Sequence, residues 1–443
     1  MQELLKKDFG PDFVWGVSAS SYQIEGGHDC DGKGKSIWDV FTNDGKRAHA
    51  NTSCDFYNNY REDLRLMAAL NIKNFRFSLS WPRILPNGTG IVNQKGIDFY
   101  NSLIDECLSL GIEPWITLYH WDLPQALEEK GGWTNRDIIH WFSEYAELCA
   151  RSFGDRVKKW MILNEPMVFL TTGYMLGMHA PGKMGLGNFI PAVHHAAMCQ
   201  AEGGRVLKKL MPDAEIGATA SLTHFEPQDP NDNDDVLAVS RVNALVNRVF
   251  IETALGMGYP FKDFDALEKL RKYMLPGDEE LLKFDFDFFG FHNYTREIIK
   301  HSYFIPVINA DMVKASKRKV PATEMDWEIY PDAMYHVLKE FGSYENMPKI
   351  YITENGAAFP DEILDGKIND TARVEFLKEN LKSVLKAKNE GIDIRGYFVW
   401  TFLDNFEWAE GFRPRFGIVH VDFETQKRTV KSSGEWYRDF LKE

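Results

Sequence analysis

The 443-residue sequence is poor in cysteine, and its few cysteines form no recognisable framework. Their number is odd, they are widely spaced, and no Cys-x-x-Cys pair occurs. This pattern excludes a disulfide scaffold and a zinc-ribbon site, and it predicts reduced thiols in a reducing compartment. The five residues are Cys30, Cys54, Cys107, Cys149 and Cys199.

Long apolar runs are also missing. No stretch reaches the roughly eighteen consecutive apolar residues of a membrane-spanning helix, so no such helix is expected. Residues 1–16 have neither an apolar core nor a small-residue cleavage site, so they do not predict a secretory signal. We therefore expect a cytoplasmic protein without a membrane partner.

Basic charge is in deficit. The chain has 51 basic and 65 acidic residues, a net charge of −14, which argues against nucleic acid as the main partner. Hydrophobic residues make up 44% of the chain, enough for a large core. Aromatic residues reach 14%, with 12 tryptophans, and tryptophan faces are common platforms for sugar rings.

Eight short apolar segments predict buried strands, and eight segments with helical periodicity alternate with them. This order predicts an α/β fold, a single (β/α)8 TIM barrel with elaborated βα loops that forms one catalytic domain over residues 1–443. A doubly wound open sheet is the rival, but no Gly-x-Gly-x-x-Gly follows the first strand. Residues 295–330 are expected to be a long irregular segment. The strands are expected at residues 13–19, 73–79, 113–119, 157–163, 215–220, 286–292, 349–353 and 394–400. The helices are expected at residues 55–70, 94–110, 135–153, 189–209, 234–254, 331–341, 371–388 and 430–441.

Two predicted strands end in a glutamate. The apolar run at residues 350–353 stops at Glu354, before an Asn-Gly turn signal, and the run at residues 160–163 stops at Asn164-Glu165-Pro166. Either glutamate alone is more simply an ordinary loop residue. Because active residues of a barrel gather at the carboxyl ends of its strands, the pair suggests the two carboxylates of a glycosidase.

The two carboxylates need different surroundings. An ionised Glu354 requires a cation, for which Arg76 on the second strand is the candidate, although Arg76 could instead form a salt bridge at the barrel bottom. A protonated Glu165 requires an apolar wall that raises its pKa, and Trp160 and Met161 are the nearest apolar side chains in its own strand.

Six motifs in order resemble glycoside hydrolase family one, the retaining β-glucosidase family, nearly from end to end. Thr353-Glu354-Asn355-Gly356 and Asn164-Glu165-Pro166 are similar to its two signature motifs. The other four are Phe13-Val14-Trp15-Gly16 through Tyr22-Gln23-Ile24-Glu25-Gly26, Phe75-Arg76-Phe77-Ser78-Leu79-Ser80-Trp81, Tyr119-His120-Trp121-Asp122-Leu123-Pro124, and Trp400-Thr401 with Glu407-Trp408.

The resemblance implies a role for each matching residue. Glu354 would be the nucleophile and Glu165 the acid and then the base, with Arg76 and Tyr294 holding Glu354 in place. Asn164 would bind the sugar 2-hydroxyl, and Trp327 would lie on the aglycone side. The remaining substrate-binding residues would be Gln23, His120, Trp121, Trp400, Glu407, Trp408 and Phe416. Metal ligands and cofactors are not implied.

Simpler readings stay open for several of these residues. His120 could be a core histidine, Gln23 and Glu407 solvated loop residues, and Trp400, Trp408 and Trp327 packing residues. The pair at residues 194–195 is interpreted as packing, and the acidic run at residues 229–235 as an exposed loop followed by a helix start.

Two positions depart from the family pattern. His292 stands where the family usually has asparagine, which leaves the local hydrogen bonding open. After the fifth strand the chain reads Ala220-Ser221-Leu222-Thr223, where some relatives have an asparagine that faces the leaving group.

The resulting hypothesis is an exo-acting retaining β-glycosidase, a β-glucosidase acting on unphosphorylated β-D-glucosides, with β-galactosides, β-fucosides and cello-oligosaccharides as further candidates. The expected partner is a small β-glycoside or oligosaccharide, and an assembly of identical chains is left open. One alternative is a 6-phospho-β-glycosidase, which Glu407 should disfavour by repelling a phosphate and Phe416 by lacking a donor. The other is a catalytically silent sugar-binding barrel, which would typically have lost one of the two glutamates.

Overall fold

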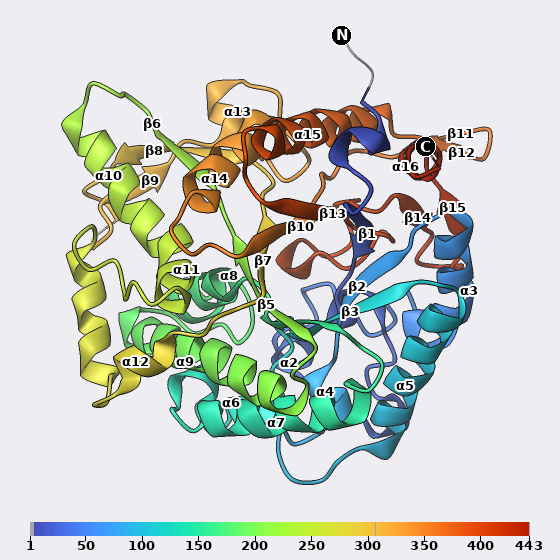
Figure 1. The fold of residues 1–443 in the computed structure, drawn as a ribbon, viewed down its shortest axis with the longest axis horizontal. Helices are drawn as coiled ribbons and strands as arrows, with labels where there is room; N and C mark the ends of the chain where they lie inside the picture. Colours follow the sequence, from blue (N-terminus) through green and yellow to red (C-terminus); the bar gives the residue numbers. More distant parts are fainter. Residues whose placement is uncertain (1–3, 306, 443) are drawn as a thin grey trace.

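Eight parallel strands close into a barrel at the centre of the molecule (Figure 1). The structure is a computed structural model that describes residues 4–305 and 307–442. Around the barrel the strand order is β1-β2-β3-β4-β5-β7-β10-β13, and β13 pairs back onto β1. The predicted barrel is confirmed, and the rival open sheet is wrong because hydrogen bonds join the two outer strands. The strands are β1 (Val14–Ser18), β2 (Asn74–Ser78), β3 (Glu113–Tyr119), β4 (Lys159–Leu163), β5 (Glu215–Ser221), β7 (Phe288–His292), β10 (Lys349–Asn355) and β13 (Ile394–Trp400).

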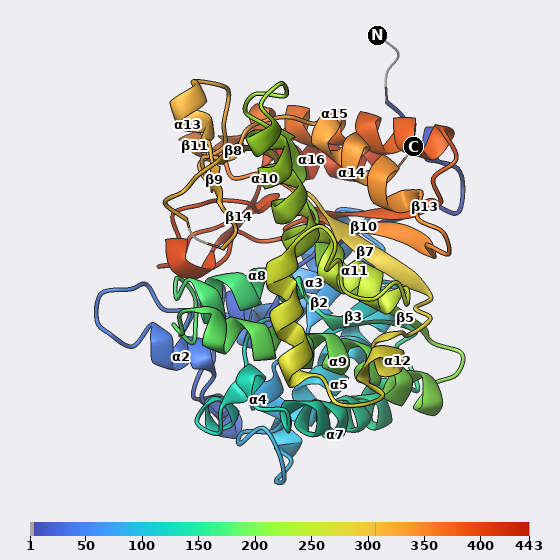
Figure 2. The same ribbon diagram turned by 90° about the vertical axis from the view of Figure 1, so that its left-hand side faces the viewer.

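Helices cover the outside of the barrel, as expected for right-handed crossovers between parallel strands. In Figure 2, α14 and α15 lie on one side of the strands and α5 and α7 on the other. The long helices are α3 (Phe56–Ala69), α5 (Gln94–Ser109), α7 (Ile138–Phe153), α9 (Leu186–Leu210), α10 (Asn233–Asn243), α14 (Asp332–Gly342), α15 (Thr371–Asn389) and α16 (Ser432–Phe440). The short ones are α1 (Ser21–Ile24), α2 (Ile37–Phe41), α4 (Trp81–Ile84), α6 (Gln125–Glu128), α8 (Pro166–Leu170), α11 (Val249–Ala254), α12 (Asp278–Leu282) and α13 (Ala315–Arg318). The helix predicted at residues 234–254 is divided between α10 and α11 by a π-helical turn.

Large side chains fill the interior of the barrel. Because alternate residues of a strand point inward, a few strands are enough to supply a packed layer. The layer consists of Trp115, Met161, Phe288, Tyr351 and Phe398, all buried. Trp115 is the parallel partner of Arg76 on β2, so the first charged side chain of the interior lies directly beside this layer. The layer therefore forms a dry floor beneath the carboxyl ends of the strands.

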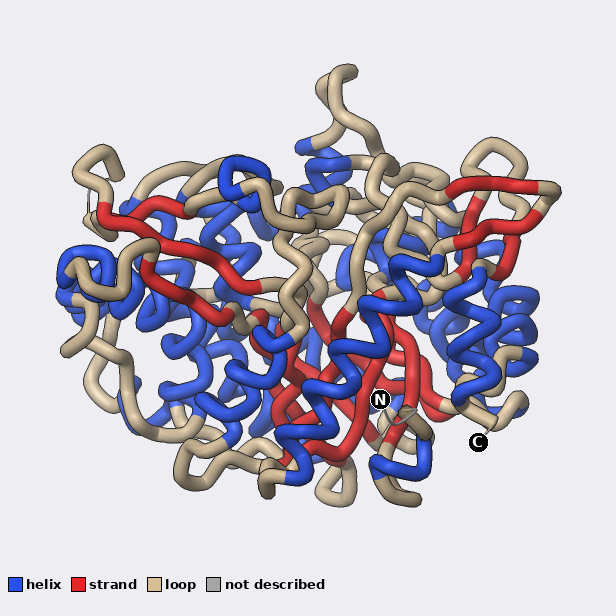
Figure 3. Tube along the Cα trace, turned by 90° about the horizontal axis from the view of Figure 1, so that it is seen from above, coloured by secondary structure: helices blue, strands red, loops and turns tan. Residues whose placement is uncertain are grey.

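Three small sheets are added to the barrel by its loops. The segment at residues 295–330 was predicted to be irregular, and this is wrong: β8 (Arg296–His301) pairs with β6 (His224–Pro227) and β9 (Ala310–Met312), and α13 follows. The sequence signal was weak because these strands are short and only half-buried. The other two sheets are the pairs β11 (Glu362–Leu364) with β12 (Lys367–Asn369) and β14 (Val419–Val421) with β15 (Arg428–Val430). Figure 3 shows the three-stranded sheet on the left of the barrel and the two pairs on the right.

Among the described helices, none combines the length and the apolar composition that crossing a bilayer requires.

The acidic run at residues 229–235 starts as an exposed loop and ends in the first turn of α10, as expected, although Asp235 is buried. The carboxylate of Asp232 caps that helix by accepting from the backbone of Asp234.

Candidate active site

Glu165 follows the end of β4 in a left-handed backbone conformation. Its φ and ψ angles are 44° and 59°, and Pro166 begins α8 directly after it, so the strand ends here as the sequence predicted. A non-glycine residue in this region is strained and needs support from its neighbours. Thr219 on β5 gives this support, because its hydroxyl accepts the backbone hydrogen of Glu165 at 3.1 Å and donates to the Leu163 carbonyl at 2.9 Å.

Glu354 lies within β10, beside a break in the strand register. Ile352 pairs with Phe291 of β7 and Glu354 with His292, so two residues of β10 advance against one of β7. Such a bulge turns a strand locally and re-aims its side chains. As a result, Thr353 and Glu354 both face His292. The predicted strand stopped at residue 353, and the extension to Asn355 corrects that boundary.

Gly356, which follows β10, is needed for close packing against another strand and not for the turn that the sequence predicted. Its φ is not in the left-handed region, and a Cβ at this position would lie 1.8 Å from the backbone oxygen of Trp400. The residue must therefore be glycine to allow β10 and β13 to approach closely. The Asn-Gly pair that looked like a turn signal instead lets two barrel strands meet at their carboxyl ends.

Arg76 and Tyr294 both hold the Glu354 carboxylate. The guanidinium of Arg76 donates to Oε1 of Glu354 and to Oδ1 of Asn164, and the hydroxyl of Tyr294 donates to Oε2 of Glu354 at 2.7 Å. Arg76 pairs with Glu354 near the carboxyl end of β10, so the alternative of a salt bridge at the barrel bottom is wrong. The two donors hold the carboxylate in one orientation.

The two glutamates approach each other across the top of the barrel. One oxygen of Glu165, one of Glu354 and a ring nitrogen of His292 all lie within 4.8 Å of one another. Carboxyl groups about 5 Å apart suit direct attack on a sugar, whereas about 6.5–9.5 Å is needed to admit a water between them. Three such atoms could also ligate a metal, but the Arg76 guanidinium already pairs with Glu354 here.

The hydrogen bonds of Asn164 define the protonation of His120. Because Arg76 donates to Oδ1 of Asn164, the amide nitrogen faces Nε2 of His120, 2.9 Å away. Nε2 must then accept, which places the proton of His120 on Nδ1. Burial keeps the pKa of His120 well below its usual value, so the ring is neutral. Among the described residues, Nδ1 has no protein partner and is a buried donor left for a ligand.

Gln23 and Glu407 form a second polar group. The amide nitrogen of Gln23 donates to the backbone oxygen of Phe406 at 2.8 Å and to Oε2 of Glu407 at 3.3 Å, while its oxygen accepts from Ser20. This group is connected to the two glutamates by charge: burial, followed by the charges on Glu354 and Glu165, raises the pKa of Glu407 to about 8.

Aromatic residues surround these polar groups. Trp400 lies 5.9 Å from the His120 ring and belongs to a cluster with Phe416, against which Tyr294 and Trp327 pack. Trp408 packs 4.5 Å from Trp121. The indole hydrogen of Trp121 is already donated to the backbone oxygen of Asn164 at 2.9 Å. Within this structure Trp121 therefore supports Asn164, a contact that the sequence did not reveal.

Burial also changes the acidity of Glu165. It raises the pKa of Glu165 to about 7, and a hydrogen bond from Ser221 and the charge on Arg76 act in the opposite direction. The sequence left open whether Trp160 and Met161 form an apolar wall for Glu165. Met161 faces the aromatic floor, and Trp160, on the alternate side of β4, packs in the main core between barrel and helices. The contacts of Glu165 come from neighbouring strands instead, from Thr219 on β5 and His292 on β7.

Two further groups of titratable residues are accounted for by internal pairing. His194 contacts Asp278 at 2.8 Å and the hydroxyl of Tyr259 at 3.0 Å, in agreement with its interpretation as a packing residue. The contact with Asp278 joins residues far apart in the sequence, so spacing could not predict it. Asp361, Asp404 and His420 are close enough to hold a metal, but the ammonium of Lys431 lies between the two carboxylates, at 2.6 and 2.8 Å.

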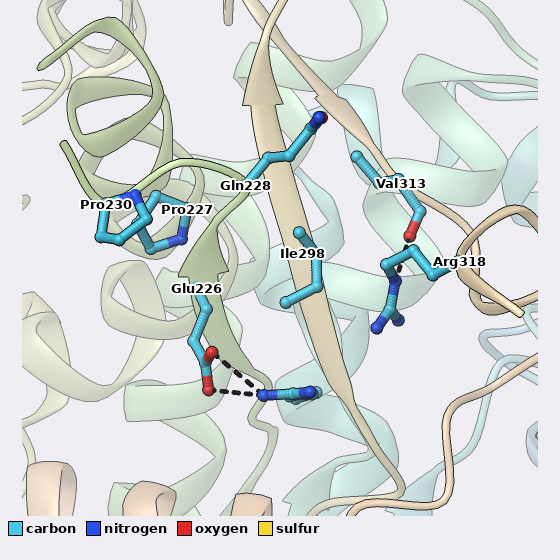
Figure 4. A pocket seen from close by; sticks show the side chains of 8 residues that line it. Glu226, Pro227, Gln228, Pro230, Ile298, Val313 and Arg318 are labelled. Atoms are coloured by element: carbon cyan, nitrogen blue, oxygen red, sulfur yellow. Dashed lines mark hydrogen bonds and ion pairs between the residues drawn. The ribbon is translucent and has the colours of Figure 1, made fainter. Parts of the chain in front are cut away.

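A hollow of about 440 Å³ lies along β6 and β8 (Figure 4). Both cationic side chains that line it are already paired with carboxylates. Arg296 donates to both oxygens of Glu226 at 3.0 Å, and Arg318 donates to Glu328 at 2.7 Å. Residues predicted for the active site are absent from its lining, which consists of Glu226, Pro227, Gln228, Pro230, Arg296, Ile298, Val313 and Arg318.

Comparisons with known proteins show the family and the fold of this chain. The family model described as glycosyl hydrolase family 1 matches residues 5–443. Beta-glucosidase A of Thermotoga maritima is 43% identical over 98% of both chains, and beta-glucosidase A of Acetivibrio thermocellus is 41% identical over 99% of both. The solved structure of the family 1 β-glucosidase from Thermotoga maritima covers 98% of both chains with a TM-score of 0.93 at 42% identity.

Proposed function

Because the chain belongs to glycosyl hydrolase family 1, we propose that it is an exo-acting retaining β-glycosidase that hydrolyses unphosphorylated β-D-glucosides. The observation that carries the proposal is that an oxygen of Glu165 and an oxygen of Glu354 lie within 4.8 Å of each other, while the two carboxyl groups have different surroundings. Glu354 is held by a guanidinium and a hydroxyl, whereas burial keeps Glu165 protonated up to a pH of about 7.

In the first step, Glu354 is the nucleophile. Its carboxylate attacks the anomeric carbon while Glu165 gives its proton to the glycosidic oxygen, and the aglycone leaves as an alcohol. Arg76 and Tyr294 keep Glu354 in one orientation before the attack, so little reorganisation is needed in the transition state. Once Glu165 has lost its proton, its charge is exposed to that of Arg76, which partly stabilises it.

In the second step, Glu165 is the base. It takes a proton from a water molecule that attacks the anomeric carbon from the side the aglycone has left, and the bond to Glu354 breaks. Two displacements at one carbon return the original configuration. The proton that Glu165 receives restores the acid for the next cycle, so water is the one co-reactant that each turnover consumes.

The neutral sugar is held by mixed donors and acceptors. His120 contributes its unpartnered Nδ1 hydrogen, and Asn164 is oriented by Arg76 to contact the 2-hydroxyl as charge develops at the neighbouring carbon. Gln23 and Glu407 form the other polar edge, and Trp400, Trp408 and Phe416 supply apolar surface. Trp327, which packs 5.3 Å from Tyr294, is proposed to contact the aglycone, including the next glucose of a cello-oligosaccharide.

A product analysis tests this proposal. We expect a panel of aryl β-glycosides to be cleaved with the glucoside preferred, with galactoside and fucoside as secondary substrates, and proton NMR to detect β-glucose first. Early appearance of α-glucose would contradict the retaining mechanism. Release of single glucose units from the end of cellotetraose would support exo action, whereas cellobiose as the initial product would oppose it.

The activity should depend on pH through Glu165. With a pKa of about 7 the acid is protonated below this pH, so kcat/KM should fall by about tenfold per pH unit above it. The measurement is kcat/KM for an aryl β-glucoside between pH 5 and about 9, in which the fall that begins near pH 7 is attributed to Glu165 and a further break near pH 8 to Glu407. A flat profile across pH 7 would contradict the assignment.

The 6-phospho-β-glycosidase alternative is less well supported, although one sequence argument against it needs refinement. With a pKa of about 8, Glu407 is largely neutral at pH 7 in the empty site and does not repel a phosphate by charge alone. What disfavours a phosphate is the lack of donors, because Phe416 offers none and Glu407 can donate only one hydrogen. Both catalytic glutamates are present, which disfavours the silent barrel.

Substitution of Glu407 tests its contact with the sugar. Because serine is too short to reach the sugar hydroxyls that the half-buried Glu407 carboxyl is proposed to bind, Glu407→Ser should lower kcat/KM for unphosphorylated glucosides by about tenfold or more. The matched control is Glu410→Ser, an exposed glutamate three residues away that pairs with Arg413 and should be unaffected. Equal activity of the two variants would remove Glu407 from the sugar-binding shell.

The proposed compartment is the cytoplasm. All five cysteines are free thiols, and four of them are buried, which fits a reducing environment. Burial raises the pKa of these buried thiols, so they are poor nucleophiles.

A further inference from the structure

A buried histidine lies between the two glutamates. Nδ1 of His292 is 2.8 Å from Oε1 of Glu165 and 3.5 Å from Oε1 of Glu354, and Nε2 is 2.8 Å from the hydroxyl oxygen of Thr353. We propose that His292 is a positioning residue that donates its Nδ1 hydrogen to Oε1 of Glu165 and thereby confines the acid proton to Oε2. This inference rests on the proposed function, in which Glu165 is the acid and base.

The imidazole is neutral, so it has one donor and one acceptor. Its side chain is completely buried, and burial lowers the pKa of His292 to about 3 even though the charge on Glu354 opposes the shift. A neutral ring cannot donate from both nitrogens. The position of its single hydrogen therefore decides whether Nδ1 is a donor or an acceptor toward Oε1 of Glu165.

Two neighbours place this hydrogen on Nδ1. Within the described part of the chain, the only hydrogen bond of the Thr353 hydroxyl is to Nε2, so its hydrogen is used only if Nε2 accepts. The carboxylate of Glu354 is near Nδ1, and a bare lone pair there would face its negative charge, whereas an N–H is attracted to it. Both contacts favour the same tautomer.

The backbone makes this arrangement possible. The bulge in β10 places Thr353 and Glu354 side by side against His292, one at each ring nitrogen. On β7, Gly290 lies two residues before His292, and a Cβ there would be 2.4 Å from the Thr353 hydroxyl oxygen. The absence of a side chain at Gly290 therefore leaves the space in which Thr353 reaches the ring.

The consequence for catalysis follows from proton geometry. The carbonyl oxygen of a carboxylic acid accepts hydrogen bonds better than its hydroxyl oxygen, so an Nδ1–H donor at Oε1 favours the acid form of Glu165 that carries its hydrogen on Oε2. When Glu165 gives that proton to the glycosidic oxygen, its new charge is stabilised by the Nδ1–H donor. His292 keeps its own hydrogen throughout, and water returns a proton to Oε2 in the second step.

Three substitutions at one position separate this role from packing. In asparagine the amide nitrogen is two bonds from Cβ, as Nδ1 is in histidine, so His292→Asn retains the donor to Glu165. His292→Gln moves the amide one bond further, toward Thr353, and His292→Leu has no donor. In the glutamine and leucine variants, we expect the pH at which kcat/KM begins to fall to move upward by about one pH unit or more. The reason is that the Glu165 anion loses its hydrogen-bond donor, which raises the pKa of Glu165. In the asparagine variant, kcat/KM should fall at the same pH as in the unmodified enzyme.

The outcomes distinguish this inference from the proposed function. An unshifted fall in the glutamine and leucine variants, or equal shifts in all three, would overturn the role of His292. If instead Glu165→Gln keeps the fall that begins near pH 7, the assignment of Glu165 has failed, whereas a fall only near pH 8 belongs to Glu407. A measurement on the unmodified protein avoids any folding defect. In histidine ¹⁵N NMR, the signals of His292 are those that disappear in His292→Asn, and they should show a protonated Nδ1. A protonated Nε2 with an unprotonated Nδ1 would overturn the inference.

Discussion

Glu354→Gln should lower turnover of aryl β-glucosides by about 10⁴-fold or more, the scale expected when a covalent nucleophile is removed. Glutamine is similar in size to glutamate; its amide oxygen can still accept from Arg76, and its amide nitrogen can donate to the hydroxyl oxygen of Tyr294, so the site should retain its shape. Its amide oxygen cannot form a stable bond to the anomeric carbon, so the first displacement is lost whatever the leaving group. The measurement is kcat for a substrate with a good leaving group, for which acid catalysis matters least.

The control for this substitution is Glu113→Gln. Glu113 begins β3 at the opposite end of the barrel, so the same chemical change there should leave kcat unchanged. Circular dichroism and thermal melting should be compared for both variants, because Arg76 loses its charged partner in a fully buried position and the fold can be weakened. A folded Glu354→Gln enzyme with near-normal turnover would exclude Glu354 as the nucleophile.

Glu165→Gln should reveal itself in the dependence on the leaving group. Loss of the proton donor should reduce kcat/KM by about 10²–10⁴-fold for substrates with a poor leaving group, such as cellobiose, from which glucose departs. The reduction should be much smaller for a dinitrophenyl glucoside, which departs without protonation. Because kcat/KM reports the first displacement, the comparison isolates the acid role from the base role.

A small anion tests the base role of the same residue. In Glu165→Gln the covalent intermediate should accumulate, since no base activates water, and azide should restore kcat because it attacks without losing a proton. The product should be the β-glucosyl azide, formed on the face that the aglycone left. An equal loss of kcat/KM for good and poor leaving groups, with no response to azide, would rule out Glu165 as acid and base.

Much of the site could be predicted because local rules agree with the tertiary structure. Eight short apolar runs separated by helical periodicity indicate parallel strands, and parallel strands in a barrel bring their carboxyl ends to one face. Glu165 and Glu354 were therefore expected to meet although 189 residues separate them. Arg76 was a candidate for the cation that Glu354 needs, with a salt bridge at the barrel bottom as the alternative. The structure confirms the pair of Arg76 with Glu354.

What could not be predicted depends on contacts between strands. The bulge in β10 has no local signature, yet it sets Thr353 and Glu354 against one histidine. Gly356 carried a misleading turn signal, because the requirement for glycine comes from the Trp400 carbonyl on another strand. The partner of the Trp121 indole and the enclosure around Glu165 are likewise supplied by residues distant in sequence.

The sequence by itself determined the barrel, the two glutamates and the family, since hydrophobic period and short motifs are properties of neighbouring residues. Only the tertiary structure decided how acidic Glu165 is and which groups lie around its proton. Acidity depends on burial and on charges within a few ångströms, and the chain brings these together only when the strands close. His292 is the clearest case, because a departure from the usual pattern acquires meaning only beside Glu165, Thr353 and Glu354.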